Sequence, residues 1–140
     1  MTRLIAFGSS DTFGHYLETD DSKPSPRAWP GVLGSMLECE SINNANTGSS
    51  NIEILLDILK FDFKQNDIVV VGWTFPFRDY LIDKNKQLGP WSPEIETLAE
   101  LYGKKDMGIR TGLYISHAEL YLESKNLKQQ HFLLRKLMPL

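Results

Sequence analysis

The sequence predicts an α/β domain built on a parallel sheet. Two short apolar runs, at residues 4–7 and 68–73, and a weaker candidate at residues 40–45 have the length of strands, and each precedes a segment with helical periodicity. Alternation of this kind is typical of βαβ units, in which a helix connects two parallel strands. The run at residues 68–73, Ile-Val-Val-Val-Gly-Trp, is apolar at nearly every position, as expected for a strand covered on both faces.

The composition is that of an ordinary globular domain. The chain has 140 residues, of which 41% are hydrophobic and 24% charged, so it can bury a core and is not a disordered chain. A net charge of -3 without a basic cluster gives no electrostatic reason to expect a nucleic-acid partner. The single cysteine, Cys39, excludes an internal disulfide and a cysteine-based metal site, and its place in an apolar pattern predicts a small buried side chain.

The N-terminal apolar run is too short for a signal peptide. No stretch approaches the roughly 18 apolar residues that a membrane span needs. We therefore expect a cytoplasmic protein without a membrane partner.

The first part of the chain predicts a strand, a loop and a helix. The strand at residues 4–7 ends at a Gly-Ser-Ser turn, and residues 18–27 are polar and hold two prolines, as in a loop. A helix follows with Pro30 in its first turn, where a missing N–H does no harm. Its apolar positions recur at helical spacing: Trp29, Val32, Leu33, Met36 and Leu37.

The weaker strand candidate at residues 40–45 leads through a loop at residues 46–49 into a second helix. Ser50 and Glu53 have the spacing of a capping box at the start of that helix. The apolar face predicted behind this cap consists of Ile52, Leu55, Leu56 and Leu59. The strand at residues 68–73 comes next, followed by a loop rich in aromatic residues and prolines at residues 75–90.

Ser92 and Pro93 predict the start of a further helix, which Gly103 terminates. Its predicted apolar face is formed by Ile95, Leu98, Ala99 and Tyr102. Residues 112–138 are predicted to be helical in two pieces that meet near residues 124–126, with no strand. The strand at residues 68–73 would then be an unpaired apolar edge, which proteins avoid. Three explanations exist for such an edge: the domain is truncated, another copy in an oligomer covers the edge, or the last helices fold over it. We prefer truncation.

Small polar residues follow each predicted strand, at residues 8–10, 46–48 and 72–74. Open sheets of parallel strands collect their binding sites at the carboxyl ends of the strands. The sequence therefore predicts a functional site where these three segments meet.

Residues 7–14, Phe-Gly-Ser-Ser-Asp-Thr-Phe-Gly, resemble the first block of the SGNH/GDSL hydrolases, F-G-D-S-x-T-x-G. Four positions match that block, namely Gly8, Ser10, Thr12 and Gly14, and Ser9 replaces its aspartate. Residues 44–51 are similar to the second block, whose glycine contributes a backbone N–H to the oxyanion hole.

Residues 69–74 stand in the place of the third block, G-x-N-D, with Thr74 instead of the asparagine. Together with Pro76 and Arg78 they are similar to a variant found among phage-type members of the family, so a phage gene is one expected source. The resemblance implies one domain over residues 1–140, apparently truncated at its C-terminus. It also implies a three-layer α/β/α sandwich with a flavodoxin-like parallel sheet.

The same resemblance implies a serine ester hydrolase. It would act on O-acyl esters, for example O-acetyl groups of carbohydrates or small acyl esters, without a metal or another cofactor. Ser10 takes the position of the nucleophile, and the oxyanion hole is expected from Ser10, Gly48 and Thr74.

The chemistry of these residues agrees with that expectation but leaves alternatives. A serine at a tight strand-to-helix turn can attack an acyl carbonyl, and the backbone N–H groups of Ser10 and Gly48 can stabilise the oxyanion. Ser10 can instead cap the following segment, and Gly48 can serve a left-handed turn. The Thr74 hydroxyl reaches less far than an amide and is more typical of a strand end.

Four further residues are candidates for a substrate cleft: Asp11, Asn46, Trp73 and Arg78. Asp11 is also explained by the dipole of a helix that starts nearby. Trp73 and the aromatic residues after it can equally pack the long loop: Phe75, Phe77 and Tyr80. Arg78 can hold an anionic group, although an ion pair with Asp79 or Asp83 is the preferred interpretation.

The general base of the family lies in a late Asp-x-x-His block, and this block does not occur in the chain. His15, just after the first block, is the candidate base by position. His117 is predicted to be a packed core residue on a stripe with Leu113, Leu120 and Tyr121. His131 is placed in the last amphipathic segment, whose apolar positions are Leu127, Leu134 and Leu137.

Three functions follow from these observations. The first is the ester hydrolase. The second is an inactive binding module for a glycan or a protein, which the missing Asp-x-x-His block favours. The third, phosphate or nucleotide binding at the first turn, ranks last because the chain lacks both G-x-G-x-x-G and a P-loop lysine.

Overall fold

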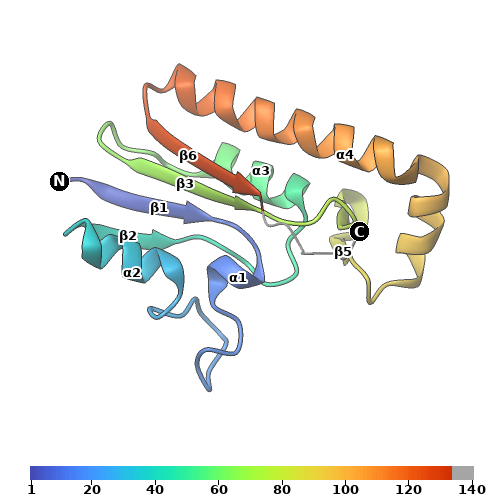
Figure 1. Ribbon diagram of the computed structural model, residues 1–140, viewed down its shortest axis with the longest axis horizontal. Helices are drawn as coiled ribbons and strands as arrows, with labels where there is room; N and C mark the ends of the chain where they lie inside the picture. Colours follow the sequence, from blue (N-terminus) through green and yellow to red (C-terminus); the bar gives the residue numbers. More distant parts are fainter. Residues whose placement is uncertain (134–140) are drawn as a thin grey trace.

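The computed structural model describes residues 1–133, except the side chains of Ala99, Tyr102 and Lys104. Its centre is a four-stranded sheet in the order β2-β1-β3-β6, in which every neighbouring pair is parallel (Figure 1). The strands are β1 (Arg3–Phe7), β2 (Glu40–Asn43), β3 (Ile68–Trp73) and β6 (Lys128–Leu133).

The two central strands are the most apolar ones, as the sequence predicts. In β1 every residue from Leu4 to Phe7 has no exposed surface, and in β3 the same holds for Val69, Val71 and Trp73. Phe7 lies beside Val71, and Ala6 lies beside Asn43 of β2. Because of this register, the three strands end at the same level, and the segments that follow them meet.

Helices cover both faces of the sheet, which confirms the three-layer α/β/α architecture (Figure 1). On one face, α3 (Asn51–Lys60) and α4 (Pro93–Ser124) pack against the sheet. The core of this layer joins strand residues such as Phe7 and Val71 to Ile58 of α3 and Leu122 of α4. On the other face lies α2 (Trp29–Met36).

Helix α2 packs through small residues and leaves much of its predicted apolar face in solvent. Pro30 and Gly34 are its buried residues, and a Cβ on Gly34 would stand 2.6 Å from the Cβ of Ser41. The helix therefore lies close against β2 and presents Val32 and Met36 outward, with 50% and 75% of their surface exposed. Cys39 is half-buried rather than buried.

The capping box of α3 is confirmed. Ser50 accepts from the Glu53 N–H and the Glu53 carboxylate accepts from the Ser50 N–H. The buried face of the helix, however, differs from the predicted one and consists of Asn51, Ile54, Leu55 and Ile58. Apolar residues surround most of this helix, so its periodicity fits two faces, and only the position of the sheet selects one.

The segment predicted as a loop at residues 75–90 contains a small hairpin. Its antiparallel strands are β4 (Asp79–Leu81) and β5 (Lys86–Leu88), joined by a 3-10 turn, η1 (Ile82–Lys84). The turn closes at Asn85, which has a φ of 48°. A second small core of Leu88, Ile95 and Met107 anchors the hairpin to α4.

Gly103 interrupts α4, as predicted, with a φ of 69° and a ψ of 167°. The chain then resumes a helix that ends at Ser124. The prediction that His117 packs in the core is wrong, because His117, Leu113 and Leu120 all lie on the exposed face. The buried positions of this part of the helix are Met107, Thr111, Ala118 and Leu122.

The prediction of a helix after residue 126 is also wrong, because residues 128–133 form strand β6. β6 pairs with β3 over its whole length, from Ile68 beside Lys128 to Trp73 beside Leu133. Free N–H and C=O groups of a buried strand need partners, and β6 supplies them. β3 therefore has no unpaired edge, and the polar strand β6 forms this edge of the sheet instead. Leu134 and Leu137 lie outside the described residues.

No helix within residues 1–133 is both long enough and apolar enough to span a membrane.

Candidate active site

Ser10 and Gly48 are brought into contact at the carboxyl ends of β1 and β2. The Gly48 N–H donates to the Ser10 Oγ over 3.3 Å. Gly48 adopts a φ of 73°, in the left-handed region that glycine occupies without strain. Gly48 therefore does both: it forms a left-handed turn, and its N–H binds the Ser10 hydroxyl.

The turn that carries Ser10 is tightly packed. α1 (Ser10–Phe13) begins at Ser10 and is closed by its C-cap Gly14, which has a φ of 79°. A Cβ on Gly8 would stand 2.1 Å from the Thr12 Oγ1, so no side chain fits at residue 8. Thr12 is in turn held by the Asn43 amide, which donates to its carbonyl over 2.6 Å. Ser9 is buried, whereas Ser10 is only partly covered.

Ser10 does not act as a helix cap. It is the first residue of α1, and its hydroxyl oxygen accepts from Gly48 of another loop. The N-cap of α1 is Ser9, which makes no side-chain cap hydrogen bond. As the first helical residue, Ser10 also has a backbone N–H without a partner inside the helix.

The β4–β5 hairpin supports the loop that carries Gly48. Gln87 of β5 donates through its Nε2 to the Thr47 carbonyl over 3.2 Å and to the Glu53 Oε1 over 3.1 Å. The Gln87 Oε1 lies 2.7 Å from the position that a Cβ on Gly48 would occupy. The sequence predicts Glu53 only as part of the capping box and gives no role to Gln87, since their contact depends on a hairpin that the composition does not reveal.

Thr74 lies at the end of β3 and is 1% exposed. Asn51 of α3 binds its backbone twice, since the Oδ1 accepts from the Thr74 N–H over 2.8 Å and the Nδ2 donates to the Thr74 carbonyl over 2.9 Å. The backbone N–H of Thr74 is therefore engaged, and only its hydroxyl remains as a donor. No hydrogen bond joins Thr74 to Ser10 within the described residues.

Arg78 enters the site from the loop after β3. Its Nη1 donates to the Ser9 Oγ over 2.6 Å and to the Ser49 carbonyl over 3.4 Å. Its guanidinium carbon lies 5.4 Å from the centre of the Trp91 ring. Burial lowers the pKa of Arg78, while the charges of Asp11 and Glu53 oppose this shift.

The preferred pairing of Arg78 with Asp79 or Asp83 is wrong. Asp79 lies 3.5 Å from Arg110 of α4 instead, and Arg78 has no carboxylate within 4.0 Å in the described part of the chain. Through its hydrogen bonds to Ser9 and Ser49, Arg78 belongs to the cluster around Ser10.

Trp73, a candidate for the cleft, is completely buried in the core beneath α4. Its Nε1 donates to the His131 Nδ1 over 3.0 Å, and the His131 Nε2 lies 2.7 Å from the Gln129 Oε1. Burial lowers the pKa of His131. Trp73 in the core thus pairs with the half-buried His131 of β6, and neither lines the cleft.

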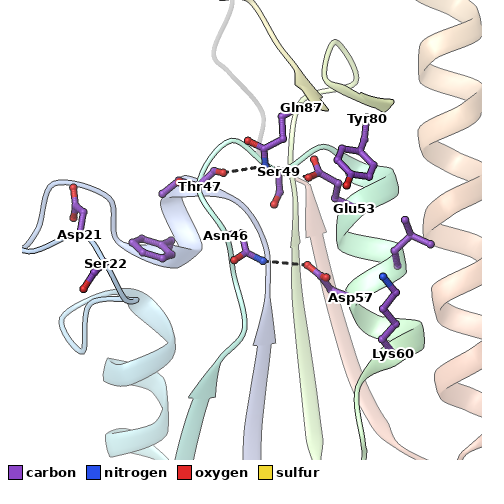
Figure 2. Close-up of a pocket in the computed structure, with 12 residues that line it drawn as sticks. Asp21, Ser22, Asn46, Thr47, Ser49, Glu53, Asp57, Lys60, Tyr80 and Gln87 are labelled. Atoms are coloured by element: carbon purple, nitrogen blue, oxygen red, sulfur yellow. Dashed lines mark hydrogen bonds between the residues drawn. The ribbon is translucent and has the colours of Figure 1, made fainter. Parts of the chain in front are cut away.

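A cleft of about 430 Å³ is lined by Thr47 and Ser49, the residues on either side of Gly48, whereas Ser10 and Gly48 themselves are not among its lining residues (Figure 2). The residues around it are mostly polar: Phe13, Asp21, Ser22, Asn46, Thr47, Ser49, Glu53, Leu56, Asp57, Lys60, Tyr80 and Gln87. In Figure 2, Asp21 and Ser22 lie on one side and Glu53, Asp57 and Tyr80 on the other.

Two of the predicted cleft residues have polar neighbours of their own. The Asn46 Nδ2 donates to the Asp57 Oδ2 over 3.2 Å (Figure 2). Burial is the main cause of a raised pKa at Asp57, and the Asn46 amide opposes it. Asp11 is exposed in the first turn of α1, where it acts on Arg78 through its charge rather than through a hydrogen bond. Phe77 packs against the second core instead of the cleft.

The histidines are dispersed. The His15 Nδ1 lies 3.1 Å from the Asp21 Oδ2, and its ring lies 3.6 Å from that of Tyr16 between centres. The His15 N–H donates to the Ser10 carbonyl over 3.1 Å. In residues 1–133 no histidine ring hydrogen-bonds the Ser10 hydroxyl. The same residues contain no group of three or more His, Cys, Asp or Glu side chains arranged to bind a metal.

No protein-family model matches the chain. No curated protein matches it either. Among solved structures, it is similar to a protein from Desulfitobacterium hafniense DCB-2 described as lipolytic and of the G-D-S-L family, with 16% identity and a TM-score of 0.41 over 92% of this chain and 76% of that one. A likeness at this TM-score supports no conclusion about family or function, so the proposals below depend on the geometry of the chain itself.

Proposed function

We propose that this protein is a serine ester hydrolase of SGNH type, formed by residues 1–140 as one domain and acting on O-acyl esters such as O-acetyl groups. The observation that carries the proposal is the 3.3 Å hydrogen bond from the Gly48 N–H to the Ser10 Oγ. In a tetrahedral intermediate, the attacking oxygen and the oxyanion are bound to the same carbon. A donor this close to the first oxygen is therefore also close to the second.

In the proposed reaction, Ser10 Oγ attacks the acyl carbon and a base removes its proton. The carbonyl oxygen becomes an oxyanion, which the backbone N–H groups of Ser10 and Gly48 stabilise. The intermediate collapses, the ester C–O bond breaks, and the leaving alcohol takes up the proton. Water then releases the acyl group from Ser10 in the same manner.

The proposed reaction needs a base that takes the proton of Ser10. His15 is the candidate by position, and its Nδ1 lies 3.1 Å from the Asp21 Oδ2 without being aligned as a hydrogen bond. The ring must turn away from Asp21 or move together with it to reach Ser10. Thr74 is assigned a smaller role, through its hydroxyl alone.

The cleft favours a polar acyl substrate such as an acetylated carbohydrate. Hydroxyl, amide and carboxylate groups dominate its walls, and they match the hydrogen-bonding pattern of a sugar. Asn46 belongs to these walls, whereas Trp73 does not.

A second candidate function is a binding module that uses the same cleft without chemistry. The observation in its favour is that no titratable side chain in residues 1–133 hydrogen-bonds the Ser10 hydroxyl. Such a protein would bind an O-acetylated sugar and leave it intact.

The decisive experiment is intact mass spectrometry after incubation with a serine-directed fluorophosphonate. We expect one adduct on the wild type, none on Ser10→Ala, and an unchanged adduct on Ser35→Ala, which removes an exposed serine of α2. No adduct on folded wild-type protein would contradict the hydrolase. Chemical-shift changes on titration with an O-acetylated monosaccharide would then support the binding module.

A further inference from the structure

Arg78 connects the two loops that hold the proposed catalytic groups. Its Nη1 donates to the Ser9 Oγ over 2.6 Å and to the Ser49 carbonyl over 3.4 Å. Ser9 directly precedes Ser10, and Ser49 directly follows Gly48. One guanidinium nitrogen therefore touches the neighbour of the proposed nucleophile and the neighbour of the proposed oxyanion donor.

The surroundings of this contact make it strong. Ser9 and Ser49 are each 1% exposed, so water competes little for either acceptor. Hydrogen bonds from a charged donor are about twice as strong as neutral ones. Trp91 covers the guanidinium from one side, at 5.4 Å. The side chain is thus fixed between a ring and two buried acceptors.

The charge of Arg78 is not neutralised by a close partner. Within residues 1–133 it forms no ion pair, and Asp11 and Glu53 act on it only at longer range. Its Nε is buried and has no hydrogen-bond partner in this part of the chain. A fixed positive charge beside a forming oxyanion stabilises it, because a group already oriented in the site needs no reorganisation.

We propose that Arg78 is a positioning residue that holds the turn after β1 and the loop after β2 at the separation where the Gly48 N–H meets the Ser10 Oγ, and that its charge stabilises the oxyanion formed there. The second half of this statement rests on the proposed hydrolase, whereas the first half does not. In this proposal Arg78 contributes to stabilising the oxyanion, for which the Thr74 hydroxyl reaches less far than an amide would.

The positioning role is tested by hydrogen exchange of the Gly48 amide, followed by NMR on the full chain. In Ser10→Ala the Gly48 N–H loses its acceptor, which sets the reference for a broken contact. We expect Arg78→Met and Ser9→Ala to accelerate exchange at Gly48 by about tenfold, as Ser10→Ala does. Arg27→Met, which removes an exposed arginine near α2, is the matched control and should leave Gly48 unchanged. Ser9→Ala deletes only one oxygen, so it keeps the test valid if Arg78→Met does not fold.

The electrostatic role is tested with the kinetics of nitrophenyl acetate hydrolysis. We expect Arg78→Met to lower kcat by about 10²–10³-fold with little change in KM, as for the loss of an oxyanion donor. Arg78→Lys keeps the charge but not the fork of donors, so it should recover part of kcat. A purely structural contact would give equal losses in the Lys and Met variants.

The outcomes separate the two proposals. Gly48 exchange that is unchanged in Arg78→Met and Ser9→Ala overturns the positioning role, whether or not the protein is an enzyme. Accelerated exchange in Arg78→Met and Ser9→Ala, together with a wild type that neither reacts with the fluorophosphonate nor hydrolyses the ester, supports the positioning role and contradicts the hydrolase. An active enzyme whose kcat does not depend on Arg78 overturns the electrostatic role.

Discussion

The side-chain amide of Asn51 pairs with the backbone of Thr74 on both sides, accepting from its N–H over 2.8 Å and donating to its carbonyl over 2.9 Å. This arrangement continues the hydrogen-bond pattern of the sheet one residue beyond β3, with a side chain of α3 in place of a strand. Asn51 is 2% exposed and Thr74 is 1% exposed, so neither backbone group can turn to water.

Asn51→Ala should therefore destabilise the protein by about 2–4 kcal/mol, because it leaves two buried backbone groups without partners. Urea denaturation measures the change. Asn66→Ala, at an exposed position before β3, is the control and should change the free energy of unfolding by less than about 0.5 kcal/mol. Equal stability of the two variants would contradict the role given to the Asn51 amide.

Two glycine-to-alanine variants should have opposite effects. Gly48→Ala introduces a Cβ at a φ of 73° and 2.7 Å from the Gln87 Oε1, so we expect a loss of about 1–2 kcal/mol and slower labelling of Ser10. Gly108→Ala introduces a Cβ that meets nothing within 4 Å in α4, and we expect a gain of about 0.5–1 kcal/mol. Thermal unfolding measures both, and a Gly48→Ala protein as stable as Gly108→Ala would show that residue 48 does not need glycine.

The ion pair between Arg3 and Asp67 should govern stability in acid. The Asp67 Oδ2 lies 2.6 Å from the Arg3 Nη2. Burial acts to raise the pKa of Asp67, but hydrogen bonds from Arg3 and from the Lys64 N–H outweigh it and hold the pKa below its ordinary value. Stability from this group is present above the unfolded pKa of about 3.9 and is lost as the pH falls through the lower folded pKa.

Asp67→Asn should cost about 3 kcal/mol at pH 7 and should flatten the fall of stability below about pH 4. Urea denaturation between pH 2.5 and pH 7 provides the comparison. Asp106→Asn, at an exposed position of α4, is the control and should still show the fall of stability below about pH 4. An unchanged acid limb in Asp67→Asn would contradict this assignment.

His131 should lower stability in mildly acidic solution. Burial lowers its pKa in the folded protein below 6.5, so the unfolded chain binds a proton more readily. Above the unfolded pKa of His131 the ring is neutral in both states and the protein keeps its full stability. As the pH falls from that value toward the lower folded pKa, the unfolded chain is protonated first and the free energy of unfolding decreases. Protonation also removes the Nδ1 lone pair that accepts from Trp73.

The indole N–H resonance of Trp73 should consequently shift on acidification with a midpoint below pH 6.5, together with the ring resonances of His131. His131→Gln should abolish this titration. His117→Gln, at an exposed position, should leave it unchanged. A titration of Trp73 that persists in His131→Gln would contradict the pairing.

Local interactions explain what the sequence predicts correctly. β1 and β3 are consecutive apolar residues, the capping box of α3 spans three residues, and Gly103 breaks α4 by its own backbone angles. The meeting of Ser10 and Gly48 also follows from sequence, because parallel strands of equal register end at one edge.

By itself, then, the sequence determined the α/β class, the central strands and the cluster of small polar residues at their ends. Only the tertiary structure decided which face of α3 is buried, that residues 128–133 form a strand, and that Arg78 binds Ser9. The physical reason is separation along the chain: Arg78 and Ser9 are 69 residues apart, and Trp73 and His131 are 58 apart. A periodic pattern carries information about neighbours three or four positions away, whereas these partners are chosen by the packing of a whole sheet and its helices.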